Sequence, residues 1–377
     1  MFYKNARIFC SDFQFREGAF EVVDGKFGAI LPENVPADAI DLGGATVIPG
    51  LIDVHSHGNS GFDFSDGDYE GLKTMARYYA SVGVTSFAPA SMTLPYEMLE
   101  KAFGNARRLV DEDNEGLAVL RGIQMEGPYF SYKKRGAQNP DYLKDPDFDG
   151  FMKLQEGCGG LIRIADLAPE LPGAVEFIEK AKDICTVSVA HTDADYDQSK
   201  AAFDAGATHL THLFNTMPGI HHRNPGVIPA AVENPWVRAE LICDGLHVHP
   251  ASMRLAFAMF GGERMIIVSD SGRCAGQPEG YQFDLGGQMA EVRGGVAKLV
   301  GTDTIACSTT NLYACLVNAI SFGIKEEDAV RASTWNPACA IGAENTVGSI
   351  ETGKRADFLV CSSDYAQKRV FLAGKAI

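Results

Sequence analysis

The sequence predicts an α/β protein: a (β/α)8 barrel with a small β domain formed by both ends of the chain. Eight short runs rich in apolar and β-branched residues recur along the chain, and helix-like segments lie between most of them. Nearly every run ends in a polar residue, as expected where the carboxyl ends of parallel strands line an active site. An open doubly wound sheet is the competing architecture, but these polar strand ends favour the closed barrel.

The predicted strands are, in chain order, VIPGLIDVHSH, GVTSFAPAS, LAVLRGIQME, LIRIADLAPE, CTVSVAHTD, ATHLTHLFN, RAELICDG and RMIIVSDS. Apolar residues at helical spacing predict helices in DYEGLKTMARYYASVG, which ends at Gly83, and in PYEMLEKAFGNARRLVD, which opens with Pro95. PGAVEFIEKAKD, DYDQSKAAFDAG and PASMRLAFAMFGG follow the same scheme. After the eighth strand, GQMAEVRGGVAKLVG predicts a hairpin, and TTNLYACLVNAISFG and KEEDAVRASTWNPACAIG predict helices that complete the barrel.

The two ends of the chain do not fit the barrel pattern. Residues 1–47 and 345–377 both read as short strands separated by turns. Neither piece is long enough to form a core alone, so we expect them to pair into one small β domain beside the barrel. The barrel domain then spans residues 48–344.

Charge and composition narrow the range of partners. The formal net charge of −16 repels polyanions, which argues against a nucleic acid or an anionic membrane as partner. We find no apolar run of the roughly 20 residues needed to span a membrane, and no secretory signal before the first predicted strand. Nine cysteines without CxxC spacing fit a reducing compartment. We therefore expect a soluble, cytoplasmic protein, in which a small anion could still bind at a local basic cluster.

Two histidines end the first predicted strand. Side chains two residues apart in an extended chain point to the same face, so His55 and His57 face the same way. Neutral imidazole is a common ligand of divalent transition metals, and two on one face supply two corners of a site. By itself this short pattern also fits a polar strand end that meets water or backbone.

Other histidines and carboxylates follow the later strands: Glu126, His191, His209, His212, His247, His249 and Asp270. Crowded at one barrel mouth, such groups cost desolvation and repulsion unless a cation offsets them. Histidine and carboxylate ligands without a thiolate cluster favour Zn²⁺ or a similar divalent transition metal. An open coordination position would lower the pKa of water to about 7 and make hydroxide available for hydrolysis.

Two further features suit amide hydrolysis of an anionic substrate. Asp270, at the end of IIVSD, is the candidate for the carboxylate that moves a proton from water to the leaving amine. A helix N-cap or Asx turn before Ser271 explains the local sequence nearly as well. In FNTMPGIHHRNPG, Asn215 and Arg223 flank a loop that contains His221 and His222. Arginine binds phosphate or carboxylate oxygens in a bidentate manner, whereas the alternative is a solvated basic loop.

The motifs PGLIDVHSHG, MEGPYFS, KKRGAQNP, AHTDADYD, THLFNTMPGIHHRNPG, CDGLHVHP and VSDS, in this order, resemble the N-acetylglucosamine-6-phosphate deacetylase family of the amidohydrolase superfamily. The resemblance runs from about residue 40 to GSIETGKRADFLV near the C-terminus. It implies a barrel with a small β-sandwich built from both termini, usually in a homodimer. It also implies a hydrolase that releases acetate from an N-acetyl amino-sugar phosphate, here N-acetylglucosamine 6-phosphate.

The resemblance also implies roles for particular residues. Glu126, His191 and His212 would hold one divalent metal, with zinc favoured and iron or another ion as alternatives. His55 and His57 match the branch of the family that keeps a second metal, bridged by Glu126, so that one or two ions would be present. Asp270 matches the general acid/base. Four positions match those that contact the sugar phosphate in the family: Asn215, the Thr216 backbone, Arg223 and His247. In the family the arginine is often supplied across the dimer interface.

The sequence departs from the family pattern around the sugar and acyl group. Gln138 stands where the family's GAHNP has a substrate-contacting histidine. SDSGRCAG replaces an Asp-Ala opening, GTDTIACSTTNL replaces a GTLAGS-like segment, and RNPG replaces REPG. Since the metal and phosphate ends are retained, the reaction type is better determined than the substrate. Two alternatives remain: another N-acyl hexosamine phosphate or phosphorylated amide as substrate, or a catalytically silent relative that binds metal.

Overall fold

Strands and helices alternate from Leu51 to Ala340 in the computed structural model, which describes residues 1–112 and 114–377. All eight predicted strands are present, the third of them split into two pieces. They are β5 (Leu51–Asp53), β8 (Val84–Phe87), β9 (Val119–Leu120), β10 (Ile123–Tyr129), β11 (Ile162–Leu167), β12 (Thr186–Val189), β13 (His209–Leu210), β14 (Arg238–Ile242) and β15 (Met265–Val268). They form two parallel sheets, ordered β5-β8-β9 and β10-β11-β12-β13-β14-β15.

The two parallel sheets adjoin at both edges without forming one continuous ladder. A single bridge between Ala90 and Gln124 joins them on one side. On the other side, the Asp270 N–H donates to the His55 carbonyl over 2.9 Å. Nearby, the buried Asp53 carboxylate accepts from the Ser269 hydroxyl over 2.6 Å. The predicted α/β fold is therefore confirmed, with one difference: among the described residues the backbone ladder is interrupted at both junctions between the two parallel sheets.

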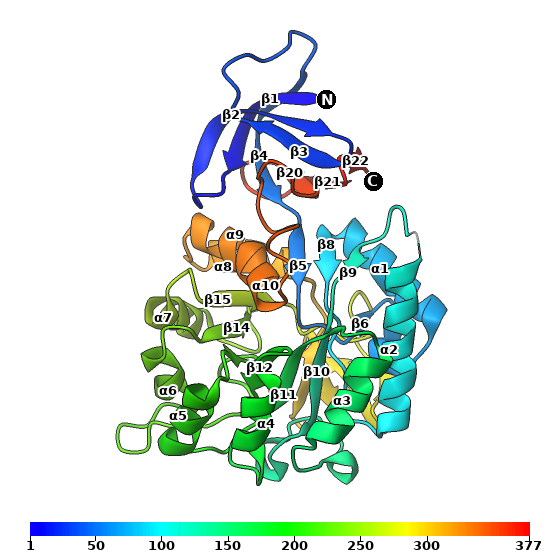
Figure 1. Ribbon diagram of the computed structural model, residues 1–377, viewed down its shortest axis with the longest axis vertical. Coiled ribbons are helices and arrows are strands. Elements are labelled where there is room, and N and C mark those ends of the chain that lie inside the picture. Colours follow the sequence, from blue (N-terminus) through cyan, green and yellow to red (C-terminus); the bar gives the residue numbers. More distant parts are fainter. Residues whose placement is uncertain (113) are drawn as a thin grey trace.

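Helices cover the outside of the parallel strands (Figure 1). Their bounds are α1 (Tyr69–Ser81), α2 (Tyr96–Asp111), α3 (Phe148–Gly157), α4 (Ala174–Ala181), α5 (Tyr196–Ala205), α6 (Val227–Glu233), α7 (Pro250–Phe260), α8 (Leu312–Ser321), α9 (Glu326–Ser333) and α10 (Trp335–Ala340). Among them, α3 and α6 were not predicted from the sequence. The described helices include none long and apolar enough to cross a lipid bilayer.

Both ends of the chain enter one seven-stranded sheet, ordered β22-β21-β20-β4-β1-β2-β3. The strands are β1 (Phe2–Phe9), β2 (Phe15–Val23), β3 (Lys26–Ile30), β4 (Ile40–Pro49), β20 (Phe358–Cys361), β21 (Lys368–Leu372) and β22 (Lys375–Ala376). The sheet curls around its own aromatic core, in which Phe20 packs edge-on against Phe358 with ring centroids 5.2 Å apart. The predicted sandwich is thus built from a single curled sheet.

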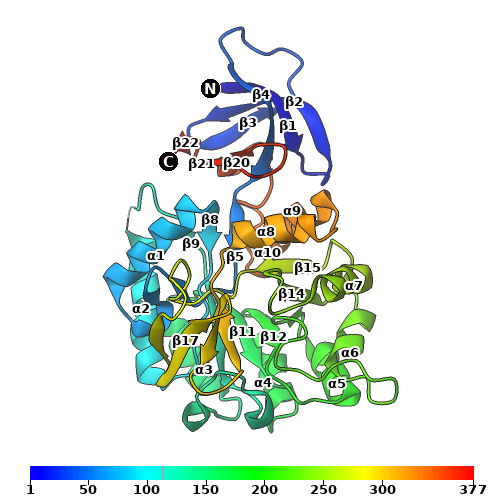
Figure 2. The same ribbon diagram turned by 180° about the vertical axis from the view of Figure 1, so that it is seen from behind.

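The small sheet sits at one end of the parallel strands, and β4 leads directly into β5 (Figures 1 and 2). The strand crosses between the two parts at Gly50, where an added Cβ atom would lie 2.1 Å from the Thr85 hydroxyl oxygen. Arg7 of β1 donates two hydrogen bonds of 2.7 and 2.8 Å to Glu326 of α9, and the Tyr365 hydroxyl donates a third of 2.8 Å. Since β5 starts at the small sheet, the carboxyl ends of the parallel strands point away from it.

An antiparallel sheet follows the eighth parallel strand. It contains β16 (Gln282–Leu285), β17 (Gln288–Arg293), β18 (Val296–Leu299) and β19 (Ile305–Ser308), and so extends the predicted hairpin by a strand on each side. Gln288 donates to the Ala137 carbonyl over 2.6 Å, and Asn139 donates to the Gly286 carbonyl over 3.0 Å. These contacts hold the antiparallel sheet against the loop that carries Gln138, beside the carboxyl ends of the parallel strands.

Candidate active site

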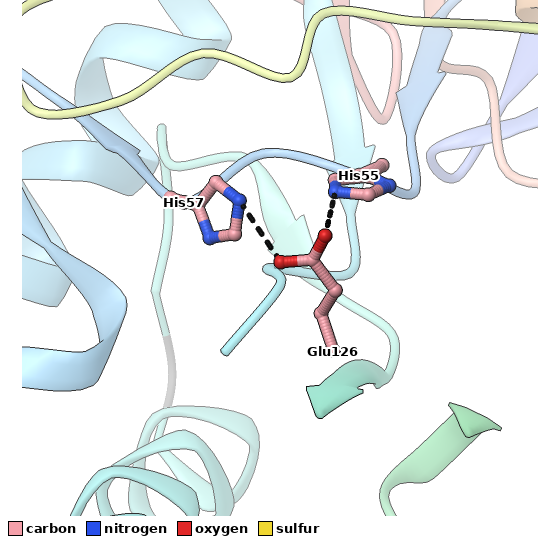
Figure 3. A group of neighbouring side chains, drawn as sticks. All are labelled: His55, His57 and Glu126. Carbon is pink, nitrogen blue, oxygen red and sulfur yellow. Dashed lines mark ion pairs between the residues drawn. The ribbon is translucent and has the colours of Figure 1, made fainter. Parts of the chain in front are cut away.

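Glu126 lies within β10 and is surrounded by the four predicted histidine ligands. One oxygen of its carboxylate, Oε1, is 3.1 Å from His191 Nε2, 3.3 Å from His212 Nε2 and 3.6 Å from His55 Nε2. The other oxygen, Oε2, is 3.3 Å from His57 Nε2. Figure 3 shows His55 and His57 directed at the two oxygens of this carboxylate. The structure thus brings together all five residues that the sequence predicts as metal ligands.

The donor atoms fit a divalent cation. They form two groups that share Glu126, one with His55 and His57 and the other with His191 and His212, and the ligand atoms of each group lie within 4.8 Å of one another. The Nε2 atoms of His191 and His212 are 3.1 Å apart, a distance at which two neutral imidazoles can share at most one proton. Nε2 of His55 is buried without a hydrogen-bond partner among the described residues. A cation would satisfy all of these atoms together.

Three residues of this cluster hold a left-handed backbone. The φ angles are 45° at His191, 32° at His212 and 45° at Asp270, values that side chains other than glycine rarely adopt. Each residue lies two positions beyond the last residue of a parallel strand, namely β12, β13 and β15 respectively. Such conformations persist where the surrounding structure over-determines them, and they cluster at functional sites. The sharp turns aim these three side chains at Glu126 and His57 rather than along the strand direction.

Burial and charge decide which protonation states the cluster favours. Burial lowers the pKa of His191, which keeps its ring neutral, and its Nδ1–H donates to the Lys134 carbonyl over 3.0 Å. Its Nε2 lone pair therefore points toward Glu126. Burial alone would also lower the pKa of His57, but the charges of Glu126 and Asp270 outweigh it and raise that pKa to about 9. A cation would compete with this proton, so metal binding at His57 releases it.

Asp270 faces both histidines of the first strand. Its Oδ1 atom is 3.4 Å from His57 Nε2 and 3.7 Å from His55 Nε2. Burial alone would raise the pKa of Asp270, but the hydrogen bond from His57 and the surrounding imidazoles lower it below its ordinary value. The carboxylate is therefore ionised at neutral pH, as an acceptor of a proton from water must be.

A cavity of about 280 Å³ opens over the cluster. His57, Glu126, His191, His212 and Asp270 line it together with the predicted substrate residues Gln138, Asn215, Thr216 and His247; its remaining lining comes from Met92, Gly136, Ala137, Thr304, Ile305 and Ala306. His55 is fully buried and lies beneath this lining. The last three residues belong to the segment that departs from the family pattern.

Gln138 contacts one of the candidate metal ligands, Glu126. Its Nε2 donates to Glu126 Oε2 over 2.7 Å, and its Oε1 accepts from the Thr93 N–H over 2.8 Å. The side chain is buried and both ends of the amide are engaged. Gln138 therefore orients Glu126 and fixes one wall of the cavity, a double role that its position in the sequence did not reveal.

His247 is oriented by an acid three residues before it. The His247 ring donates from Nδ1 to Asp244 over 2.6 Å, and Asp244 Oδ1 accepts from the N–H groups of Leu246 and His247. Burial alone would lower the pKa of His247, but the hydrogen bond and charge of Asp244 raise it above its ordinary value. His247 also lines the cavity, where its protonated ring would offer a second donor suited to an anionic or hydroxyl group.

Arg223 lies apart from the cavity. Its loop is exposed, and the N–H groups of Arg223 and Asn224 both donate to the His221 ring nitrogen. Arg223 is not among the residues that line the cavity, whereas Asn215 and Thr216, eight and seven residues earlier, are. Within one chain the structure therefore does not bring Arg223 to the site, and its expected role across a dimer interface stays a prediction.

The two segments that depart most from the family pattern meet next to Asp270. Cys274, in the loop after β15, and Cys307, in β19, place their buried sulfur atoms 3.7 Å apart. The Ser308 N–H donates to the Asp270 carbonyl over 2.8 Å, and Gly272 N–H donates to the Ser308 carbonyl. A change in one segment therefore acts on the other and on the backbone of Asp270.

Sequence reasoning missed Glu240 and gave no role to His209 or His249. Glu240 is a single acid within the apolar strand RAELI and contacts both His55 and His209 inside the barrel. The sequence signal that could have identified Glu240 is an acid flanked by apolar residues within a predicted buried strand. His249, by contrast, caps α7 by accepting from the Ala251 N–H, so its role is local.

The chain is similar to known proteins along nearly its whole length. The sequence profile of the Amidohydrolase family matches residues 46–377. The chain belongs to the amidohydrolase family. Within this amidohydrolase family it is 35% identical to N-acetylglucosamine-6-phosphate deacetylase of Vibrio furnissii, over 90% of this chain and 85% of the relative. It is 31% identical to N-acetylgalactosamine-6-phosphate deacetylase of Escherichia coli O157:H7, over 94% of this chain and 93% of the relative.

Solved structures of amidohydrolases agree with this membership. The chain superposes with a TM-score of 0.93 on a mutant of N-acetyl-D-glucosamine-6-phosphate deacetylase from Mycobacterium smegmatis in complex with N-acetyl-D-glucosamine-6-phosphate, at 32% identity, covering 100% of this chain and 98% of the other. A TM-score of 0.92 relates it to the enzyme from Pasteurella multocida, at 28% identity, with coverage of 100% and 99%. The predicted family resemblance is confirmed, and this amidohydrolase shares the barrel-plus-sandwich fold class.

Proposed function

We propose that this chain is a metal-dependent hydrolase that removes the acetyl group from N-acetylglucosamine 6-phosphate, giving glucosamine 6-phosphate and acetate. The observation that carries the proposal is the convergence of Glu126, four histidines and Asp270 at the floor of one cavity. Relatives of similar length that are named for this reaction support the choice of substrate class.

The residues would hold one or two divalent ions. His191 and His212 with Glu126 would form one position, and His55 and His57 with the same carboxylate would form the second. Imidazole and carboxylate donors favour zinc, with iron as the main alternative. When bound, a divalent ion supplies an activated water at neutral pH and polarises the amide carbonyl.

The side chains of this chain would move the proton and hold the substrate. Asp270, ionised and 3.4 Å from His57 Nε2, would accept a proton from the attacking water and pass it to the amide nitrogen as the C–N bond breaks. His247 and Asn215, at the cavity wall, are placed to donate to the sugar and its phosphate. Gln138 keeps Glu126 oriented throughout, since its amide donates to the carboxylate.

A second substrate calls for a direct comparison because one relative of similar identity is named for N-acetylgalactosamine 6-phosphate. The two sugars differ only in the configuration at C4. Thr304, Ile305 and Ala306 belong to a segment that departs from the family pattern and form part of the cavity wall. They would contribute to the selection between the two sugars.

Arg223 would complete the phosphate site from a second copy of the chain. Its exposed loop and its separation from the cavity of its own chain support this arrangement. The proposal therefore includes a homodimer, and the expected location is the cytoplasm. Light scattering after size-exclusion chromatography measures the oligomeric state. Mixing inactive D270N subunits with R223A subunits tests the shared site. Only a mixed dimer would contain a site with both Asp270, from the R223A subunit, and Arg223, from the D270N subunit.

The decisive assay measures acetate and free amine released from a panel of N-acyl hexosamine 6-phosphates by protein reconstituted with zinc or iron. We expect turnover of N-acetylglucosamine 6-phosphate to exceed that of the galacto isomer and of the non-phosphorylated sugar. Higher turnover of another panel member would reassign the substrate. Tightly bound metal without hydrolysis of any member would instead favour a catalytically silent, metal-binding relative.

A further inference from the structure

Glu240 is an acid buried inside the barrel that the catalytic scheme does not use. It lies in β14 between apolar neighbours, and none of its surface is exposed to solvent. An isolated ionised carboxylate in such a place costs several kcal/mol unless partners compensate for its lost hydration. Glu240 has three such partners, and two of them belong to predicted metal ligands.

The first partner is the His55 ring. Glu240 Oε2 lies 2.7 Å from His55 Nδ1 and also accepts from the His212 N–H over 3.2 Å. An ionised carboxylate can only accept, so Nδ1 of His55 must carry the proton. The lone pair of the neutral ring is then on Nε2, the atom that lies 3.6 Å from Glu126 and has no hydrogen-bond partner of its own within the described chain. Glu240 therefore selects the tautomer that can bind a cation.

The second partner, His209, holds the other carboxylate oxygen. Its Nε2 lies 3.0 Å from Glu240 Oε1, and its ring is fully buried. Because Oε1 is engaged by His209, the carboxylate cannot rotate away from His55 without breaking a buried hydrogen bond. This contact explains why the segment THLTHLF carries a histidine three residues before the ligand His212.

We propose that Glu240, anchored by His209, is a positioning residue that fixes the tautomer and direction of His55, and that the metal position of His55, His57 and Glu126 depends on it. The inference rests on the proposed metal-dependent function, which it deepens by assigning a residue to one of the two ions. The other position has a different support, because His191 donates from Nδ1 to a backbone carbonyl, that of Lys134. Removing Glu240 should therefore affect the two ions unequally.

The test is a zinc titration of metal-depleted protein, competed against a chelator and checked by elemental analysis. Wild type is expected to take up two ions. Glu240→Leu keeps the bulk but removes the acceptor, and we expect affinity for one ion to fall about 10- to 100-fold, the usual effect of losing such a partner, while the other ion stays near wild-type affinity. Glu240→Gln retains an acceptor oxygen for His55 and should recover most of the lost affinity.

The matched control is Asp166→Asn, which alters another fully buried acid of the barrel interior. Asp166 accepts from the side chains of Gln124 and Thr211, neither of which is a predicted ligand. Burial raises its pKa, so the neutral amide is a mild replacement. We expect this variant to bind both ions as wild type does. Equal losses in Glu240→Leu and Asp166→Asn, or equal weakening of both ions in Glu240→Leu, would mean that Glu240 only supports the core and would overturn the proposal.

A measurement on the zinc-loaded wild type does not depend on a Glu240 variant folding. In histidine-labelled protein, long-range proton–nitrogen spectra distinguish the two ring nitrogens, and His55 is assigned by the signal lost in His55→Asn. We expect a protonated Nδ1 and a metal-bound Nε2. A His55 ring without a proton on Nδ1 would overturn the inference. The proposed function fails by another route, namely zinc-loaded wild type that hydrolyses no member of the substrate panel.

Discussion

The two ends of the barrel use charged residues in opposite ways. At the end that faces the small sheet, Arg7, Glu326 and Tyr365 form a closed set in which the carboxylate accepts from both partners. At the carboxyl end, imidazole nitrogens crowd around Glu126, and Nε2 of His55 is buried with no hydrogen-bond partner in the described part of the chain. Satisfied charges indicate a stabilising role, whereas buried donor atoms that only a cation would satisfy indicate a functional one. In barrels of this kind, function gathers at the carboxyl end.

The largest effect should follow from Glu126→Gln, since this carboxylate belongs to both ligand groups. An amide cannot match its charge, so we expect both ions to be lost and turnover to fall to the background rate. Elemental analysis and the acetate-release assay check this together. A variant that retains two ions and measurable turnover would contradict the functional role of this end of the barrel, because Glu126 would then be only a structural residue.

A large but different effect is expected of Asp270→Asn. Loss of the proton carrier should lower kcat by about 10²- to 10⁴-fold, while the metal content stays at the wild-type level. Glu126→Gln should lose the ions, whereas Asp270→Asn should keep them and lose turnover. The two variants therefore distinguish a role in metal binding from a role in proton transfer at the same end of the barrel. Turnover like that of the wild type would rule out Asp270 as the acid/base.

At the opposite end, Arg7→Ala should change stability rather than catalysis. The side chain is about a third exposed, so its two hydrogen bonds to Glu326 are screened, and we expect a loss of about 1 kcal/mol in the free energy of unfolding. Denaturant unfolding measures this loss, and steady-state kinetics with saturating metal should show kcat within about twofold of wild type. A fall in kcat comparable to that of Asp270→Asn would remove the distinction between the two ends.

The smallest effect concerns pH. Burial alone would raise the pKa of Glu326, but the hydrogen bonds from Arg7 and Tyr365 outweigh it and lower the pKa below the ordinary 4.5. A lowered folded-state pKa gives stability that is fully present above about pH 4.5 and is lost as the pH falls through the folded value. The stability difference between wild type and Arg7→Ala should therefore be constant from about pH 5 to 7 and shrink at lower pH. A difference that grows on acidification would contradict this assignment.

Local pattern was sufficient to predict most of the fold, because apolar runs that end in polar residues gave the eight strands. The spacing of His55 and His57 placed both rings on one face, whereas their grouping with Glu126 followed from the family resemblance and agrees with the geometry. The interrupted ladder was not predictable, because its junctions join segments that are far apart in the sequence, such as Asp53 and Ser269, which are 216 residues apart. Contacts between residues so far apart in the sequence produce no periodic pattern of apolar and polar residues from which they could be predicted.

Contacts between distant segments explain the other omissions at the site. Glu240 looks like an exception within an apolar strand until β14 is placed beside His209 of β13, where the Glu240 side chain contacts both His209 and His55. The amide of Gln138 engages Glu126 rather than only the cavity, which its likeness to a substrate-contacting position could not show. Each of these roles is set by a partner that pattern and spacing do not identify.

The left-handed turns at His191, His212 and Asp270 bear on how the protein tolerates loss of its ion. Backbone hydrogen bonds hold these turns from both sides, including Ser131 N–H to the His191 carbonyl and Ser308 N–H to the Asp270 carbonyl. A chelator should therefore strip the protein without collapsing its donor framework, and re-addition of metal should restore it without refolding. The same framework would bind several divalent ions of similar size, so the concentrations of these ions in the cell would determine which one the protein binds.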